Sequence, residues 1–159
     1  MSCLIRAMGL EDLDRVLAIA GESIEAPRWG RQDYEQTLLA APEVLTRSCW
    51  IALSGAGAVG FAVCSWLQQE PAAEVEGLVV QRAFRRQGIG GALIAACMAW
   101  ARDQGATTIR LEVRASNAAA IALYQRHGFS PAGVRRGYYT APLEDALLLE
   151  SPLFGGTPL

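Results

Sequence analysis

A basic, glycine-rich turn between an apolar strand end and an apolar helix constrains this chain more than any other feature. The strand end is Leu78–Val80, and three arginines and three glycines follow within the next eleven residues. Glycine lets the backbone approach a ligand closely, and the first N–H groups of a helix have no partner within that helix. The helix dipole adds positive charge at the same point, so the stretch predicts a site for an anion such as phosphate.

The glycine spacing separates this turn from two common phosphate-binding motifs. A P-loop requires a Lys directly after its last glycine, and the dinucleotide motif reads Gly-x-Gly-x-x-Gly. This chain instead reads Arg-x-x-Gly-x-Gly from Arg85 to Gly90. The alternative interpretation of the stretch alone is a glycine-rich strand-to-helix turn with solvated arginines.

Length and composition predict one domain with a sizeable core. The chain has 159 residues, and 52% of them are hydrophobic, which suits a single domain over residues 1–153. We expect the last residues, 154–159, to form a loose tail.

Charge and cysteine usage exclude several classes of protein. The net charge of −2 gives no overall field that attracts nucleic acid. The four cysteines lie far apart in apolar contexts, so we expect buried thiols, no metal site, no disulfide framework and a cytoplasmic location. The N-terminus does not resemble a signal peptide, and the longest apolar run is too short to span a bilayer, so no membrane association is expected.

Hydrophobic periodicity predicts an α/β fold of the α+β type. We expect a mixed, mostly antiparallel central sheet of about seven strands, with about four helices on its two faces. The predicted strands are 3–8, 48–54, 59–68, 73–80, 108–114, 129–136 and 146–151, and the predicted helices are 9–23, 31–41, 88–104 and 117–127. Strands 73–80 and 108–114 are joined through a long helix and should therefore be parallel neighbours.

The strand Thr108–Arg114 carries an unusual row of charges. Strand periodicity places Arg110, Glu112 and Arg114 on one face, although a central strand between two helical connections should be apolar on both faces. Either this face is solvated near a sheet edge, or it opens into a cleft in which Glu112 acts as a base.

The next helix carries two polar residues on one face. Asn117 is a good N-terminal cap, and Asn117, Ile121 and Tyr124 share a face because they are four and three residues apart. If that face is directed toward the preceding strand, Tyr124 borders the same cleft as Glu112; otherwise Tyr124 packs in the core. His127, at the end of the helix, is expected to have a surface role.

Together these residues resemble the GCN5-related N-acetyltransferase (GNAT) superfamily, and within it the RimI-type bacterial enzymes that acetylate peptide N-termini. The resemblance rests on the glycine turn, on the run Leu111–Tyr124, and on Gly128-Phe129 directly after it. Arg135–Tyr139 and Glu144–Ala146 extend it. It covers roughly Leu78–Leu149, whereas the N-terminal half matches only in its order of elements.

The resemblance implies transfer of an acetyl group from acetyl-CoA to the N-terminal amine of a protein, such as a ribosomal protein with a terminal Ala. It implies that Glu112 is the general base and that Tyr124 is the general acid to the departing thiolate. Trp29, Tyr138 and Tyr139 would flank the acceptor. Cofactor contacts would come from the strand end, the turn and the helix cap: Leu78, Val79, Val80, Arg85, Arg86, Gln87, Gly88, Ile89, Gly90, Gly91 and Asn117.

The chemistry of amine acetylation agrees with these roles. An ammonium has no lone pair, so a base must remove its proton before it can attack a thioester. A chain-terminal amine has a pKa of about 7.7–8.0, which is low enough for a carboxylate to suffice. A covalent acyl-enzyme is not expected, because the chain has no Cys–His pair to form one.

Some features leave the acceptor and the base open. RimI-type enzymes usually have an aromatic residue, Pro, Trp and Ser in the loop between the first two helices, whereas this chain reads Ala-Pro-Arg-Trp-Gly over 26–30. Glu74 and Glu76 are rival bases unless they lie on a solvated strand start. One alternative is the same chemistry on a Lys side chain or a small amine. Another is a non-catalytic acyl-CoA-binding module, but the presence of both Glu112 and Tyr124 argues against it. The oligomeric state is not set by the sequence.

Overall fold

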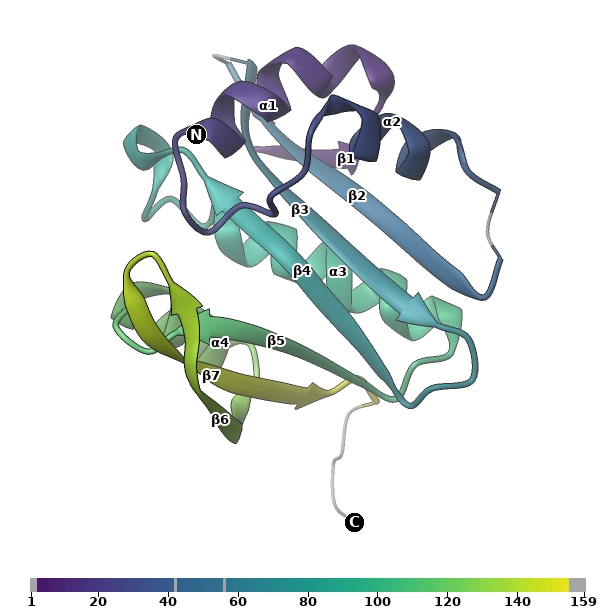
Figure 1. The fold of residues 1–159 in the computed structure, drawn as a ribbon. Coiled ribbons are helices and arrows are strands. Elements are labelled where there is room, and N and C mark those ends of the chain that lie inside the picture. Colours follow the sequence, from purple (N-terminus) through teal and green to yellow (C-terminus); the bar gives the residue numbers. More distant parts are fainter. Residues whose placement is uncertain (1–2, 42, 56, 155–159) are drawn as a thin grey trace.

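A single seven-stranded sheet forms the centre of the computed structural model, which describes residues 3–41, 43–55 and 57–154 (Figure 1). The strand order is β1-β2-β3-β4-β5-β7-β6. The strands are β1 Leu4–Ala7, β2 Leu45–Ser54, β3 Gly57–Leu67, β4 Ala72–Val80, β5 Thr108–Arg114, β6 Ser130–Thr140 and β7 Leu143–Pro152. β4 and β5 are parallel, as predicted, and the other neighbouring pairs are antiparallel.

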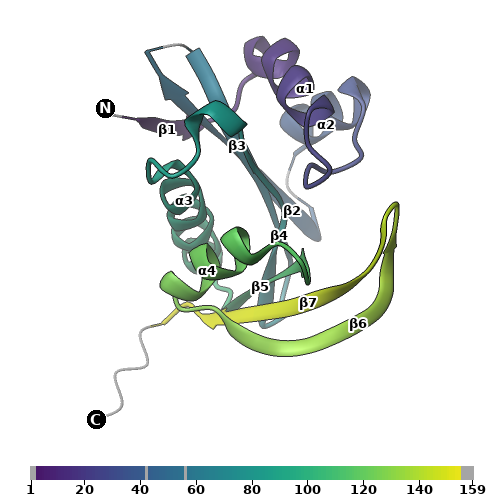
Figure 2. The ribbon, with the colours of Figure 1, turned by 90° about the vertical axis from the view of Figure 1, so that its left-hand side faces the viewer.

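Helices cover both faces of the sheet, as predicted (Figure 2). They are α1 Leu13–Gly21, α2 Arg31–Leu39, α3 Ile89–Gln104 and α4 Ala118–Arg126. α1 and α2 lie on one face, and α3 and α4 lie on the other. Strand β3 is consequently buried along Ala58–Ser65, residue after residue, because both of its faces are covered.

The core consists of two apolar clusters, one on each side of the sheet. On the α3 side, Leu93, Ile94 and Cys97 are fully buried against the strands. On the α1 side, α1 packs with Tyr34 and Phe61. Three of the four cysteines are buried free thiols, as expected from their apolar contexts. No helix in the described part of the chain is long and apolar enough to cross a membrane.

Several element boundaries differ from the predicted ones. The predicted helix 9–23 starts later, because Leu10–Asp12 forms a 3-10 turn in which the Asp12 carboxylate accepts the Gly9 N–H at 2.8 Å. The last two strands are longer than predicted, and β6 extends through Tyr138 and Tyr139 as far as Thr140. β6 is almost entirely exposed, so no apolar alternation marks its length. Pro42, the centre of the 55–57 turn and the tail beyond Phe154 lie outside the described residues.

The parallel strands β4 and β5 separate soon after they meet. They pair only over Ala72–Glu74 and Thr108–Arg110. Farther along β4, the register with β3 shifts between Val63 and Cys64, which leaves Glu76 in a bulge. The edge of β4 that faces β5 is therefore unpaired, among the residues described, from Val75 to Val80. This divergence places a cleft in the middle of the sheet.

Candidate active site

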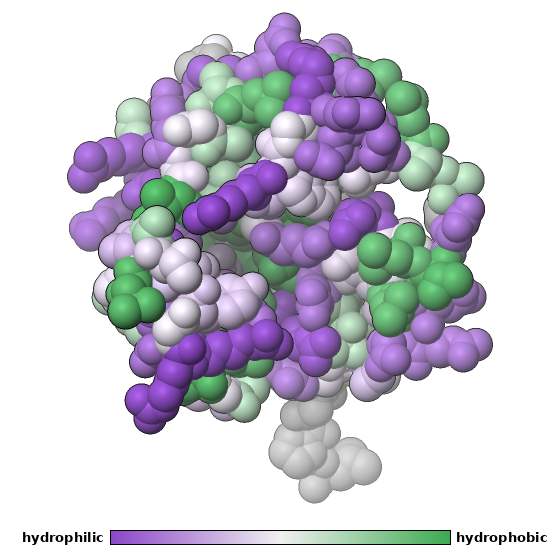
Figure 3. Space-filling view, in the orientation of Figure 1, coloured by the Kyte–Doolittle hydropathy of each residue, from purple (hydrophilic) through white to green (hydrophobic). Residues whose placement is uncertain are grey.

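A central cleft of about 570 Å³ lies where β4 and β5 diverge. Its walls come from the loop between α1 and α2, from β4 and β5, and from the far half of β6. Figure 3 shows that this face of the molecule is hollowed near its centre and bordered by hydrophilic residues. Leu148 of β7 completes the lining, so that segments distant in sequence meet around one cavity.

Four glutamates line this central cleft, and three of them hold an arginine. Glu74 pairs with Arg110 at 3.0 Å, Glu76 with Arg47 at 2.7 Å, and Glu112 with Arg135 at 3.1 Å. The fourth, Glu25, comes from the α1–α2 loop. Across the described ranges, no cluster of three or more His, Cys, Asp or Glu side chains is placed to hold a metal ion.

Glu112 lies on the charged face of β5, and that face does open into the cleft. Its side chain is 27% exposed, so water and a ligand can both reach it. A hydrogen bond to the Glu112 carboxylate raises the pKa of Tyr138, whose ring also lies 5.6 Å from the guanidinium carbon of Arg135. The candidate base is therefore covered on one side by two residues of β6.

Tyr124 is almost buried, at 7% exposure, and is not among the residues that line the cleft. Its ring packs against Phe129 with centroids 5.7 Å apart. Burial, and then the negative charge of Glu25, raise the pKa of the Tyr124 phenol. The Tyr124 hydroxyl therefore stays protonated at neutral pH, as an ordinary phenol also does.

Asn117 caps helix α4, as its position in the sequence suggested. Its side-chain oxygen accepts the backbone N–H of Ala120 at 3.2 Å. The side-chain NH₂ group then faces Glu25, where a hydrogen bond acts to lower the pKa of that carboxyl. The cap thus joins the helix terminus to the cleft.

The glycine turn leads into α3 through two residues with left-handed backbone. Arg86 has φ 63° and Gly88, the N-cap, has φ 82°. A side chain other than glycine is uncommon in this region, so such conformations tend to occur at functional sites. Arg85 donates from Nε to the Val80 carbonyl at 3.0 Å and so holds the turn against the end of β4.

The other two glycines of the turn allow α4 to pack closely on α3. A Cβ on Gly90 would lie 2.9 Å from Leu123, and one on Gly91 would lie 2.8 Å from Nε2 of His127. His127 therefore contacts the start of α3 and is not simply a surface residue. At Gly88 no atom lies within 4 Å of such a Cβ, so the space there is open.

The end of β4 offers a free edge beside this turn. Leu78, Val79 and Val80 pair with β3 on one side, whereas the side that faces β5 has no ladder partner among the described residues. A ligand with amide groups could add to such an edge as an extra strand would.

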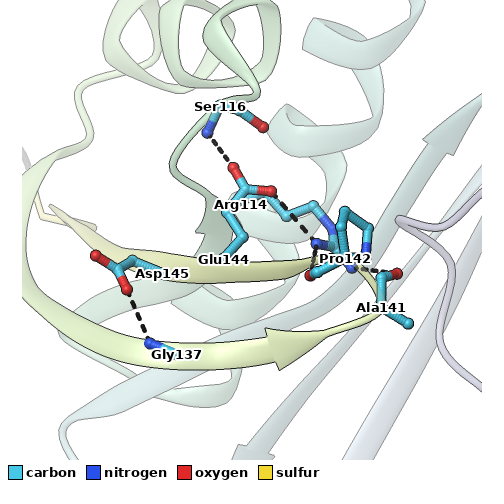
Figure 4. A network of polar contacts seen from close by, with 7 residues as sticks. All are labelled: Arg114, Ser116, Gly137, Ala141, Pro142, Glu144 and Asp145. Carbon is cyan, nitrogen blue, oxygen red and sulfur yellow. Dashed lines mark hydrogen bonds and ion pairs between the residues drawn. The ribbon is translucent and has the colours of Figure 1, made fainter.

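Arg114 is the centre of a buried polar network at the end of β5 (Figure 4). Its side chain is 5% exposed and lies 3.3 Å from Glu144, and it donates to the carbonyls of Ala141 and Pro142. Its guanidinium carbon lies 4.2 Å from the centre of the Tyr139 ring. The sequence placed Arg114 on the charged face with Glu112, but its burial was not foreseen, because the β6–β7 turn that covers it is distant in sequence.

The predicted acceptor residues lie in two neighbouring places. Tyr138 and Tyr139 line the central cleft. Trp29 lines a separate side groove of about 330 Å³ instead, where its ring packs edge-on against Tyr34. Arg114 borders both cavities.

Glu25 is the residue of the cleft that sequence reasoning missed. It is half-buried in an irregular loop, and burial raises its pKa. Neither periodicity nor a motif marks this position, because a single Glu in a loop is ordinary on a protein surface. Only the folded chain brings it to Asn117 and Arg114.

Comparisons with known proteins agree with this architecture. The model of the Acetyltransferase (GNAT) family matches residues 14–129. A candidate ribosomal protein bS18-alanine N-acetyltransferase of Bacillus subtilis is 29% identical over 91% of this chain and 92% of its own length. The Escherichia coli K12 ribosomal protein bS18-alanine N-acetyltransferase is 45% identical over 78 residues, which are 48% of this chain and 53% of that protein. A crystal structure of the E. coli enzyme superimposes with a TM-score of 0.78 at 29% identity and covers 99% of both chains.

Proposed function

Because the chain belongs to the GNAT family of acetyltransferases, we propose that it transfers an acetyl group from acetyl-CoA to the N-terminal amine of a protein. The observation that carries the proposal is the partly exposed Glu112 carboxylate in the cleft between β4 and β5, beside a free strand edge and a glycine turn. The names of the relatives support a ribosomal protein with an N-terminal Ala as the acceptor. Such an acceptor would place the reaction in the cytoplasm.

Acetyl-CoA is the acetyl donor of the family, and the residues present fit it. The free N–H groups at the start of α3 would hold its pyrophosphate, with Gly88 leaving space for it. Its pantetheine amides would pair with the open edge of Leu78–Val80. A backbone N–H of that edge would face the thioester oxygen and stabilise the negative charge that develops there.

Glu112 accepts a proton from the acceptor nitrogen in the proposed reaction. The Arg135 guanidinium must first leave the Glu112 carboxylate, so that the acceptor nitrogen can bind there. The nitrogen, as the free amine, attacks the thioester carbon and passes its proton to Glu112, so that a C–N bond forms and the C–S bond breaks. Tyr124 gives its proton to the departing thiolate.

The first test is to titrate acetyl-CoA into the pure protein and then to add peptides. We expect binding by calorimetry and acceptor-dependent release of CoA with a peptide that starts with Ala. A peptide with a blocked N-terminus and an internal Lys, and a polyamine, serve as controls for the other amines. Absence of binding at high micromolar acetyl-CoA would contradict the proposal, and binding without CoA release would favour a non-catalytic module.

Replacing Tyr124 with Phe removes the hydroxyl and keeps the ring that packs on Phe129. We expect kcat to fall by about 10²-fold, since loss of a general acid typically costs 10²–10⁴-fold, with little change in stability. Tyr34→Phe is the matched control, because the Tyr34 hydroxyl is buried without a hydrogen-bond partner in the described part of the chain. An unchanged kcat in Tyr124→Phe, measured by CoA release, would remove the assigned role.

A further inference from the structure

The glutamates of the central cleft differ in whether an arginine pairs with them. Three of the four glutamates in its wall are paired with arginines, as described above. Glu25 forms no ion pair within 4 Å among the residues that the structure describes. An incoming cation therefore finds one carboxylate in the cleft that does not already hold a positive group.

We propose that Glu25 binds the N-terminal ammonium of the acceptor and takes the first of its two protons. This inference rests on the proposed function and assigns a second carboxylate to the same site. Glu112 keeps the second proton transfer, after Arg135 has left it.

The surroundings of Glu25 suit this role. The side chain of Asn117, which caps α4, is within hydrogen-bonding reach. The charge of Glu25 is felt by the hydroxyls of both Tyr124 and Tyr139, and the Tyr139 hydroxyl also feels Glu112. Glu25 therefore lies on the same side of the cleft as Tyr124, the proposed acid. The Tyr139 hydroxyl is close enough to feel the charges of both Glu25 and Glu112.

The loop that carries Glu25 is seated on the sheet. Pro27 packs directly on Gly77 of β4, where an added Cβ would lie 2.4 Å from Cδ of the proline. Gly77 follows the bulge at Glu76. Because only a glycine leaves room for the proline ring, this contact fixes the position of Glu25 two residues earlier.

Two carboxylates match the proton balance of the reaction. The ammonium loses one proton to Glu25, and the resulting amine attacks the thioester carbon. The nitrogen then loses a second proton to Glu112, while Tyr124 gives one to the thiolate. The sum is an amide, the CoA thiol and one proton released to solvent when the three side chains return to their starting states.

The charged groups around Glu25 indicate how the reaction should depend on pH. Burial raises the pKa of the Glu25 carboxyl above its usual value; Arg114 of β5, Asn117 and Arg85 act in the opposite direction, and Glu144 of β7 adds to the rise. A raised pKa makes a carboxylate a better proton acceptor. As pH falls through this pKa, Glu25 becomes neutral and acceptor binding should be lost. Because the pKa is raised, this loss should occur at a higher pH than the protonation of an ordinary Glu.

The test compares Glu25→Gln with Glu22→Gln, a matched change at an exposed position at the end of α1. For Glu25→Gln, kcat/KM for an Ala-initiated peptide should fall by about 10–100-fold at pH 7, mostly through acceptor KM, because a charge-assisted hydrogen bond contributes about 1.5–3 kcal/mol. Its kcat/KM should keep rising up to the pKa of the peptide amine, and Glu25→Asp should restore part of the loss. Acetyl-CoA affinity should stay unchanged.

Two outcomes would overturn the assignment while leaving the proposed function intact. The first is an acceptor KM and pH profile of Glu25→Gln equal to those of Glu22→Gln. The second is a loss of acetyl-CoA binding in Glu25→Gln, which would place the effect at the cofactor. A wild-type protein that acetylates no peptide would instead contradict the proposed function itself.

Discussion

Replacing Glu112 with Gln is expected to lower kcat for an Ala-initiated peptide by about 10²–10⁴-fold, the usual range for loss of a general base. Gln has the same shape but cannot accept a proton. Arg135 loses its ion pair, but its side chain is 56% exposed, so stability should change by less than about 1 kcal/mol. Steady-state rates of CoA release measure the change in kcat, and urea unfolding measures the change in stability.

The rival carboxylates of β4 are the controls for this change. Glu74 and Glu76 line the same cleft and each hold an arginine, so Glu74→Gln and Glu76→Gln alter its charge equally. We expect both variants to retain kcat within a few fold. A large loss in either of them, together with a normal rate in Glu112→Gln, would move the base from β5 to β4.

Replacing Arg114 with Met is expected to lower the free energy of unfolding by about 3 kcal/mol, because removing one partner from a buried charged network leaves the others without a donor. Two carbonyls of the β6–β7 turn and the Glu144 carboxylate lose the guanidinium. For a chain of this length, the melting temperature should fall by about 6–12 °C. Urea unfolding monitored by circular dichroism provides the measurement.

Arg110→Met is the matched control on the same face of the same strand. Arg110 and its partner Glu74 are both about half exposed, and such ion pairs contribute about 0–1 kcal/mol. Equal losses in the two variants would show that Arg114 is not the centre of a buried network. Because Arg114 also holds the turn beside Tyr139, we expect its replacement to raise the acceptor KM.

Local sequence signals account for much of the fold. Apolar periodicity located the helices and most of the strands to within a few residues, although it did not mark the length of the exposed strand β6, and glycines at the ends of α3 and α4 marked where each helix stops. The charged face of β5 could be predicted, because alternate residues of a strand share a face whatever surrounds it; the tertiary structure decided that this face lines a cleft. The Asn117 cap was also a local property, since its bond to Ala120 spans three residues.

Contacts between distant segments decided the rest of the site. Glu25 meets Asn117 across 92 positions, and Arg114 meets Glu144 across 30. Arg135 reaches Glu112 only because β6 folds back along β7.

The glycine turn shows the division most clearly. The sequence alone predicted an anion site there from the spacing of its glycines, and the backbone angle of Gly88 fits that interpretation. The tertiary structure decided that Gly90 and Gly91 provide space for Leu123 and His127 of α4. Backbone conformation, capping and face alternation depend on neighbouring residues and can be predicted from the chain. The burial of a charge and the partner of a carboxylate depend on which distant surfaces meet, and only the packed sheet determines them.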